Sequence, residues 1–104
     1  MSPRGRRPGS RAQALVIHPG DNVATALTGL AGGSEIGVAA AQGPETIRLG
    51  GDIPRGHKFA LRAVPAGGPV IKYGEPIGVA TRDIARGDHV HVHNVASPPR
   101  GEGS

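Results

Sequence analysis

Three histidines, His89, His91 and His93, occupy alternate positions in the stretch HVHVHN. In an extended strand successive side chains point to opposite faces, so the three imidazoles would share one face and the intervening valines the other. The Cα atoms of alternate strand residues lie roughly 6.5–7 Å apart, which lets two imidazoles reach one ion at about 2.0–2.1 Å each. Fe(II), Zn(II) or Mn(II) would suit such ligands. The same alternation is typical of a solvated strand face over a valine core, so both interpretations stand.

Polar residues also gather in three other words, HPGDN, GHK and IKYGEPIG. Lys58 and Lys72 each lie among apolar residues of an expected strand, which is typical of an exposed strand face. The alternative is an anion clamp, in which the two lysines and neutral histidine donors bind a small molecule rich in carboxylates. His18 follows an apolar stretch and precedes a turn, where a lone histidine is more often structural. Asp21 and Asn22 suit the capping of a helix.

The sequence lacks the short motifs that are typical of an enzyme active without a partner. No serine lies in a nucleophile elbow, and neither GxGxxG nor a Walker motif occurs. The chain has no cysteine, which excludes disulfides and thiolate metal sites. Its 104 residues suffice for one domain, which we expect over residues 13–96. Because Phe59 and Tyr73 are the only aromatic residues, the core must be built from Val, Ile, Leu and Ala.

The net charge of +4 belongs to one end of the chain. Residues 1–12 carry four arginines and no acidic residue, and the eight basic side chains that remain are balanced by eight acidic ones. Without a basic stripe in the body, nucleic acid is not an expected partner. Residues 1–12 and 97–104 have the composition of disordered tails. The apolar stretch Ala14–Ile17 is too short for an export signal, and no stretch approaches the roughly 20 apolar residues of a membrane span, so we expect a cytoplasmic protein without a membrane partner.

The elements that must position these groups are short strands joined by glycine turns. One pattern, an apolar residue, two others, Gly, two others and a second apolar residue, occurs four times. Glycine adopts the backbone angles of a turn without strain, and proline at the second position presets the turn in two copies. The pattern therefore predicts a turn that feeds a strand. The copies are Leu30–Gly33–Ile36, Ile53–Gly56–Phe59, Val64–Gly67–Val70 and Ile84–Gly87–Val90.

Alternation and β-branching predict the strands themselves. One short helix of about two turns is expected after PGDN, capped by Asp21 or Asn22 and ending near Leu30, because apolar residues there recur at helical spacing. The fold class is therefore mainly β with many turns and one short helix. The expected strands lie near Gln13–His18, Glu35–Ala40, Thr46–Leu49, Lys58–Val64, Pro69–Tyr73, Gly78–Thr81 and His89–Asn94.

The longer words of the chain resemble a known family. From about Ala14 to Val95 the sequence is similar to the amino-terminal SAF domain of the altronate/galactarate dehydratase family, and the words that carry the likeness are HPGDNV, IPRGHK, VIKYGEPIG, AT-DI-G and HVHVHN. The resemblance implies a β-clip fold, which also occurs in sialic acid synthases, type III antifreeze proteins and flagellar P-ring assembly proteins. These words match the sugar-acid hydro-lyase branch, which includes altronate dehydratase, galactarate dehydratase and the small subunit of sulfolactate sulfo-lyase.

The resemblance implies a function as well as a fold. Because the chain starts at Met1 and stops just after the SAF domain, it is expected to be a separate small subunit that joins a large catalytic dehydratase subunit. The two would share a site for a divalent metal, expected to be iron, and act on a small hydroxy acid. The reaction would be a β-elimination, in which a base removes the proton next to the carboxylate and the metal stabilises the enediolate and the leaving hydroxyl.

Site residues follow from the same resemblance. Histidines are expected as metal ligands or acid–base groups and lysines as carboxylate partners. His89 is expected to be peripheral, because it belongs to the repeated turn-to-strand unit. The implied assignments are His57 and Lys58 as catalytic residues, His18, Lys72 and Asn94 as substrate-binding residues, and His91 and His93 as metal ligands.

Three alternatives remain open at this point. Within the same family, the chain could be the small subunit of a sulfolactate sulfo-lyase, which releases sulfite instead of water. A non-catalytic SAF binding module would serve ligand binding or protein assembly and would tolerate alanine on its histidine face. A metal-storage or metal-sensing protein would hold iron or zinc in the isolated chain and lose it when His91 and His93 are both changed.

Overall fold

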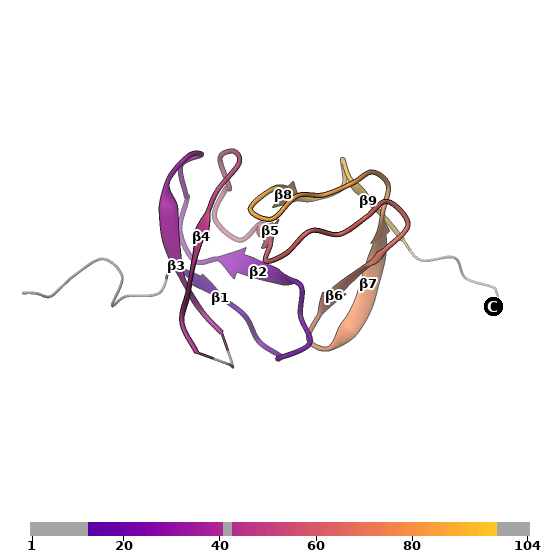
Figure 1. Cartoon of the computed structure of the whole chain (residues 1–104), viewed down its shortest axis with the longest axis horizontal. Coiled ribbons are helices and arrows are strands. Elements are labelled where there is room, and N and C mark those ends of the chain that lie inside the picture. The colour runs from indigo at the N-terminus through magenta and orange to yellow at the C-terminus, as the bar shows by residue number, and fades with distance from the viewer. Residues whose placement is uncertain (1–12, 41–42, 98–104) are drawn as a thin grey trace, which may run out of the picture.

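The computed structural model describes residues 13–40 and 43–97, and every regular element in them is a strand (Figure 1). The mainly β class is thereby confirmed, whereas the predicted tails lie outside the described residues, apart from Ser97. A helix that could cross a membrane is not found in the described part of the chain. The strands are β1 (Ala14–Leu15), β2 (Val23–Ala26), β3 (Glu35–Ala39), β4 (Glu45–Arg48), β5 (Lys58–Ala60), β6 (Pro69–Lys72), β7 (Glu75–Ala80), β8 (His89–Val90) and β9 (Val95–Ala96).

The strands form two sheets. Six strands pair in the order β4-β3-β1-β2-β5-β8, and three pair in the order β6-β7-β9. β1 runs parallel to β3, and the other pairs are antiparallel. In Figure 1, β1, β3 and β4 lie toward one end of the molecule, β6, β7 and β9 toward the other, and β2, β5 and β8 lie between them.

Strand β5 lies between two hydrophobic cores. Phe59 is fully buried in the larger core, with Ile47 and Leu49 of the six-stranded half. Its neighbour Ala60 is buried in the smaller core, with residues such as Val70 and Val90. Successive side chains of a strand point to opposite faces, so this short strand contributes to both cores at once. Residues just before and after β5 are therefore held firmly in place.

All four copies of the glycine repeat form the predicted turn before a strand. The first apolar residues pair across the molecule in two isolated bridges, Leu30 with Ile53 and Val64 with Ile84, and all four are buried. In each copy the strand begins five residues after the bridge residue. The glycines have φ between 82° and 89°, a left-handed conformation suited to the third residue of a type II turn. The turn bonds run from the backbone N–H of Ser34 to Ala31, His57 to Pro54, Gly68 to Pro65 and Asp88 to Ala85.

The two closely matching words, DIPRGHKF and DIARGDHV, share one more contact. In both, the aspartate before the bridge residue accepts a backbone hydrogen bond from the opposite turn. Asp52 Oδ1 accepts from Gly32 N–H at 2.8 Å, and Asp83 Oδ1 accepts from Ala66 N–H at 2.9 Å. Each half of the domain is thus closed by the same two contacts, an isolated bridge between two apolar residues and a backbone hydrogen bond to an aspartate.

The prediction of a short helix after PGDN is wrong. Val23–Ala26 is strand β2, which pairs with β1 on one side and β5 on the other. Three of its four residues are buried, so the stretch has no alternation, and a continuous apolar run does not distinguish a buried strand from a helix. Asn22, one of the two residues expected to cap the helix, instead binds the backbone of β6. Its Oδ1 accepts from Ile71 N–H at 2.8 Å, and its Nδ2 donates to the Pro69 carbonyl at 2.9 Å.

The strand predicted over His89–Asn94 is also too long. β8 ends at Val90, and the chain then turns through His91–Asn94 before β9 begins. Val90 is buried, as expected from alternation, but Val92 is 81% exposed at the turn. A single strand face shared by three histidines therefore does not exist, and any convergence of imidazoles must come from elsewhere in the fold.

Candidate metal centre

Three imidazoles converge where β8 pairs with the start of β5, and they come from two separate parts of the chain. They belong to His57, His89 and His91, whose ligand nitrogens all lie within 4.8 Å of one another. We call these three residues the histidine cluster. His57 Nδ1 lies 2.9 Å from His89 Nε2, a hydrogen bond in which one nitrogen carries the proton. The ring of His57 stacks on that of His91, with centroids 4.2 Å apart and planes 16° apart.

The pairing of β5 with β8 explains why these rings meet. Lys58 lies opposite Val90 and Phe59 opposite His89. Continued by one residue, this antiparallel register sets His57 opposite His91, and directly opposed side chains in such a pair are close neighbours. His57 is also the last residue of its glycine turn, where its N–H donates to Pro54 and its carbonyl accepts from Ala26 N–H.

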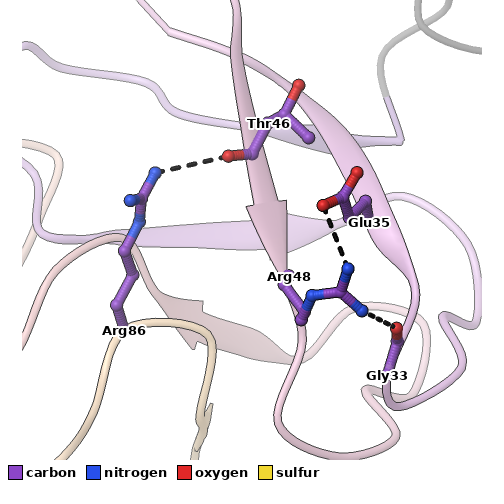
Figure 2. Close-up of polar contacts among 5 residues, drawn as sticks. All are labelled: Gly33, Glu35, Thr46, Arg48 and Arg86. Carbon is purple, nitrogen blue, oxygen red and sulfur yellow. Dashed lines mark hydrogen bonds and ion pairs between the residues drawn. The ribbon is translucent and has the colours of Figure 1, made fainter.

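The glycine turn before β8 is anchored against β4, and this fixes the position of His89. Gly50 N–H donates to the Gly87 carbonyl at 3.0 Å, and a Cβ on Gly87 would lie 2.2 Å from the Arg48 carbonyl oxygen. The guanidinium of Arg86 donates to the Thr46 carbonyl at 3.3 Å, while Arg48 binds the carboxylate of Glu35 and the Gly33 carbonyl (Figure 2). The backbone at the start of β8 therefore has little freedom.

Asn94 shapes the other side of the cluster. It is 4% exposed, and both polar ends of its side chain bind the histidine segment: Oδ1 accepts from His91 N–H at 3.0 Å, and Nδ2 donates to the His89 carbonyl at 2.9 Å. Its own N–H donates to the His91 carbonyl. Asn94, assigned from the sequence to substrate binding, is thus placed as a residue that positions the histidines.

His93 stays outside the cluster, although the sequence assigned it to the metal with His91. Its ring lies 5.2 Å from that of His89 and is tilted by 32°, and its carbonyl accepts from Arg82 at 3.3 Å. His89, expected to be peripheral, instead contacts His57 directly. The sequence contained one sign of this arrangement. In the two matching words, DIPRGHKF and DIARGDHV, the histidines His57 and His89 follow the turn glycine at nearly the same place.

The histidine cluster has the chemistry of a divalent metal site. Burial, followed by the nearby His93, His57, His91 and Lys58, lowers the pKa of His89, so its ring is neutral at neutral pH and a nitrogen lone pair is available. Three nitrogens about 2.0–2.1 Å from one ion would be about 3.4 Å apart, whereas those of the cluster lie within 4.8 Å of one another on stacked rings, so the side chains would have to turn toward the ion and move closer to bind it. Three protein ligands would also leave a coordination position for substrate.

Lys58 points to the opposite side of β5 from His57, toward a hollow of about 250 Å³. His91 and Lys58 both line this hollow, so it adjoins the histidine cluster. Lys72 lies close enough to act on Lys58 electrostatically, and its ammonium is 4.6 Å from the centre of the Tyr73 ring. The apolar walls are formed by Val70, Ile77, Val90, Val92 and Val95.

His18 is part of a different constellation, built around the buried carboxylate of Asp21. Asp21 Oδ1 accepts from Gly74 N–H at 2.8 Å, and Oδ2 accepts from His18 N–H at 3.1 Å. Burial alone would raise the pKa of Asp21, but backbone hydrogen bonds from Gly74, Tyr73 and His18 outweigh it and lower the pKa below 3.8. The ring of His18 accepts from Gly20 N–H through Nδ1 at 2.9 Å, and within the described residues no contact joins it to the histidine cluster.

The sequence of the chain matches a protein family and several known proteins. The family model described as altronate/galactarate dehydratase SAF domain matches residues 12–98. Altronate dehydratase of Escherichia coli (strain K12) is 52% identical over 82 residues, which cover 79% of this chain and 16% of that protein. Galactarate dehydratase (L-threo-forming) of the same organism is 39% identical over 86 residues, 81% of this chain and 15% of that protein. The chain thus spans about a sixth of the length of these dehydratases.

A different relative is shorter. The alpha subunit of (2R)-sulfolactate sulfo-lyase from Paracoccus pantotrophus is 58% identical over 43 residues, which cover 41% of this chain and 64% of that subunit. The likeness therefore reaches proteins whose names describe two different eliminations.

Proposed function

The chain belongs to the altronate/galactarate dehydratase SAF-domain family, and we propose that it is the SAF component of a sugar-acid dehydratase. In this proposal it binds a divalent metal ion through the histidine cluster, His57, His89 and His91. A large catalytic subunit supplies the rest of the hydro-lyase site. The observation that carries the proposal is the convergence of these three imidazoles where β5 pairs with β8.

The need for a partner is supported by the side chains around the histidine cluster. The chain's own titratable groups near the cluster are histidines and lysines, and no acidic side chain of the described residues joins the cluster. A carboxylate or other base for proton abstraction would then come from the partner.

The roles of this chain's own residues follow from their contacts. When bound, a divalent ion, expected to be iron, would act as a Lewis acid on an oxygen of the hydroxy acid. His57, His89 and His91 would hold the ion. Asn94 would be a positioning residue, because its side chain binds the backbone of both His89 and His91. The hydrogen bond from Asn94 to the His89 carbonyl holds the segment after β8, and the hydrogen bond from Ala26 N–H to the His57 carbonyl holds His57 to β2. The pairing of β5 with β8 then sets the two histidine segments relative to each other.

A second candidate is the small subunit of a (2R)-sulfolactate sulfo-lyase, favoured by the 58% identity to the alpha subunit from Paracoccus pantotrophus. Both candidates use the same histidine cluster, so metal binding does not separate them. Their leaving groups do: both eliminations leave a 2-oxo acid, but dehydration releases water and desulfonation releases sulfite.

Metal binding is tested with single alanine variants of the cluster. We expect the chain to bind one equivalent of Fe(II), under anaerobic conditions, or of Zn(II). Loss of His57, His89 or His91 should weaken binding by at least about tenfold, since even supporting residues of metal sites are worth about 10–100-fold, whereas His93→Ala should bind like the parent. Isothermal titration and metal analysis after gel filtration measure this.

The reverse result, in which His93→Ala loses the metal and His89→Ala keeps it, would support the pair suggested by sequence and reject the cluster. If neither metal binds, or if alanine at all four histidines is harmless, the non-catalytic binding module becomes the better description. Activity is then assayed after co-purification with a large dehydratase chain, following 2-oxo acid formation from altronate and galactarate and sulfite release from sulfolactate. A chain that never associates with a large partner contradicts the subunit role.

A further inference from the structure

The chain contains only two lysines, and one of them lies beside the histidine cluster. Its other ten basic side chains are arginines. Lys58 belongs to β5 of the six-stranded sheet and lines the hollow together with His91. Lys72 belongs to β6 of the three-stranded sheet, and its charge lowers the pKa of Lys58.

Neither ammonium group is neutralised by an acidic side chain within the described residues. The ion pairs found there are Arg48 with Glu35 and Arg86 with Glu45, so both involve arginine. Glu75 is the hairpin partner of Lys72 but makes no ion pair with it. Within the described residues, Lys58 is therefore a cation that lines the hollow without an acidic partner.

The hollow beside Lys58 has room for a small anion. Its volume is about 250 Å³, and its lining combines apolar walls with the ammonium-bearing Lys58 and with His91. Lys58 extends along the side of β5 that carries Ala60 and faces Val90, so its methylene groups lie against the smaller core while the charge reaches the hollow. The buried walls Val70 and Val90 keep water from one side of the hollow, which strengthens an ammonium–carboxylate contact.

We propose that Lys58 binds the carboxylate group of a small hydroxy acid in this hollow, with Lys72 as a second positive charge outside its lining. The carboxylate would accept a charge-assisted hydrogen bond from the Lys58 ammonium group. His91 lines the hollow and also belongs to the histidine cluster, so an acid anchored here lies next to the proposed metal ligands. That the acid is a sugar acid rests on the proposed function, whereas carboxylate binding by this chain needs neither metal nor partner.

The test uses the fact that the chain has two lysines. Reductive methylation with ¹³C-formaldehyde keeps the positive charge of lysine and labels only these side chains and the amino terminus. Galactarate is titrated at constant ionic strength, with galactitol as the uncharged analogue and sodium sulfate as a second anion. We expect saturable shifts of both lysine signals with galactarate and none with galactitol. Backbone shifts at His91 and Val92 in the unmethylated chain should follow the same curve.

Three variants, each a cation replaced by methionine, complete the experiment. Lys58→Met should weaken galactarate binding by about tenfold to a hundredfold, as expected for loss of a charge-assisted hydrogen bond, and Lys72→Met should weaken it less. Arg55→Met removes an exposed cation from the turn before β5 and should bind like the parent. Because Lys58 is partly desolvated beside another cation, Lys58→Met should unfold at the same or a higher temperature, which separates loss of binding from loss of fold.

Several results would overturn the carboxylate site. These are lysine signals that do not respond up to tens of millimolar galactarate, shifts that galactitol or sodium sulfate reproduces, or equal losses in the Arg55→Met control. The outcome is independent of the proposed function. Galactarate binding without metal binding at the histidine cluster would keep this site and reject the metal proposal, and metal binding without galactarate binding would do the reverse.

Discussion

Replacing Asp21 by alanine should destabilise the domain strongly, because this one carboxylate joins two distant loops. Asp21 is 1% exposed and binds the backbone N–H groups of His18 and Gly74, at 3.1 and 2.8 Å, with a further backbone hydrogen bond from Tyr73. The turn at Tyr73 and Gly74 has positive φ at both residues, 57° and 73°. Without the carboxylate, nothing described in the structure holds this strained turn against the HPGDN loop in the same way.

The expected loss can be estimated from these contacts. A hydrogen bond to a charged group contributes about 1.5–3 kcal/mol, so three would give several kcal/mol if they were independent and fully buried. Residues 73 and 74 are exposed, so water can replace part of the loss after truncation. We therefore expect about 2–4 kcal/mol, a large part of the 5–15 kcal/mol that is usual for a domain. For a domain of this size, that corresponds to a fall in Tm of roughly 10–25 °C.

Urea unfolding followed by circular dichroism at pH 7 measures the change, with Asp21→Asn as the matched variant. The amide keeps one acceptor but presents its NH2 to a backbone N–H, so it should lose about half as much as alanine. The pH dependence gives a second check. Because folding lowers the pKa of Asp21, its contribution is present above its unfolded value of 3.8 and is lost as the pH falls through the folded value. A loss under about 1 kcal/mol, or a difference from the parent that does not shrink in acid, would refute the reasoning.

Two further predictions concern the turn before β8 and the histidines. Gly87→Ala should cost more than about 3 kcal/mol or prevent folding, because φ is 89° and the new Cβ would lie 2.2 Å from the Arg48 carbonyl oxygen. Gly29→Ala, where no atom lies within 4 Å, is the control, and thermal unfolding that affects both equally would contradict the assignment. Folding lowers the pKa of His89, so the metal-free chain should lose stability as the pH falls below the unfolded value of 6.5, and urea midpoints between pH 7.5 and 5 should show it. His89→Gln should reduce that pH dependence, and an unchanged slope would mean that the ring is not perturbed.

The sequence predicted the turns and most strands because their determinants are local. A glycine with positive φ between two buried apolar residues specifies a turn at any place in the chain, and all four copies behaved alike. The edges of β3, β4 and β6 were predicted to within one or two residues by alternation. The strand β2 was misread as a helix because it is buried on both faces, where alternation disappears.

The site was harder to predict because it depends on tertiary pairing. The three histidines of HVHVHN suggested a strand face, but the buried side chain of Asn94 turns the chain after Val90. His57 joins the cluster only through the register of β5 with β8, which composition and spacing do not specify. The local pattern thus indicated that histidines carry the chemistry, whereas the pairing of β5 with β8 determined which of the histidines lie close together.

The constant length of the four turns has a consequence for how related chains can differ. Each strand starts five residues after its bridge residue, and two of these strands carry Lys58 and His89, with His57 and His91 directly beside them. Adding or deleting one residue in such a turn would shift the strand by one position and send every side chain to the opposite face. Insertions and deletions compatible with the cluster are therefore confined to segments outside the turns. Alignments of this family should show gaps there and an invariant count of residues from Ile53 to Lys58 and from Ile84 to His89.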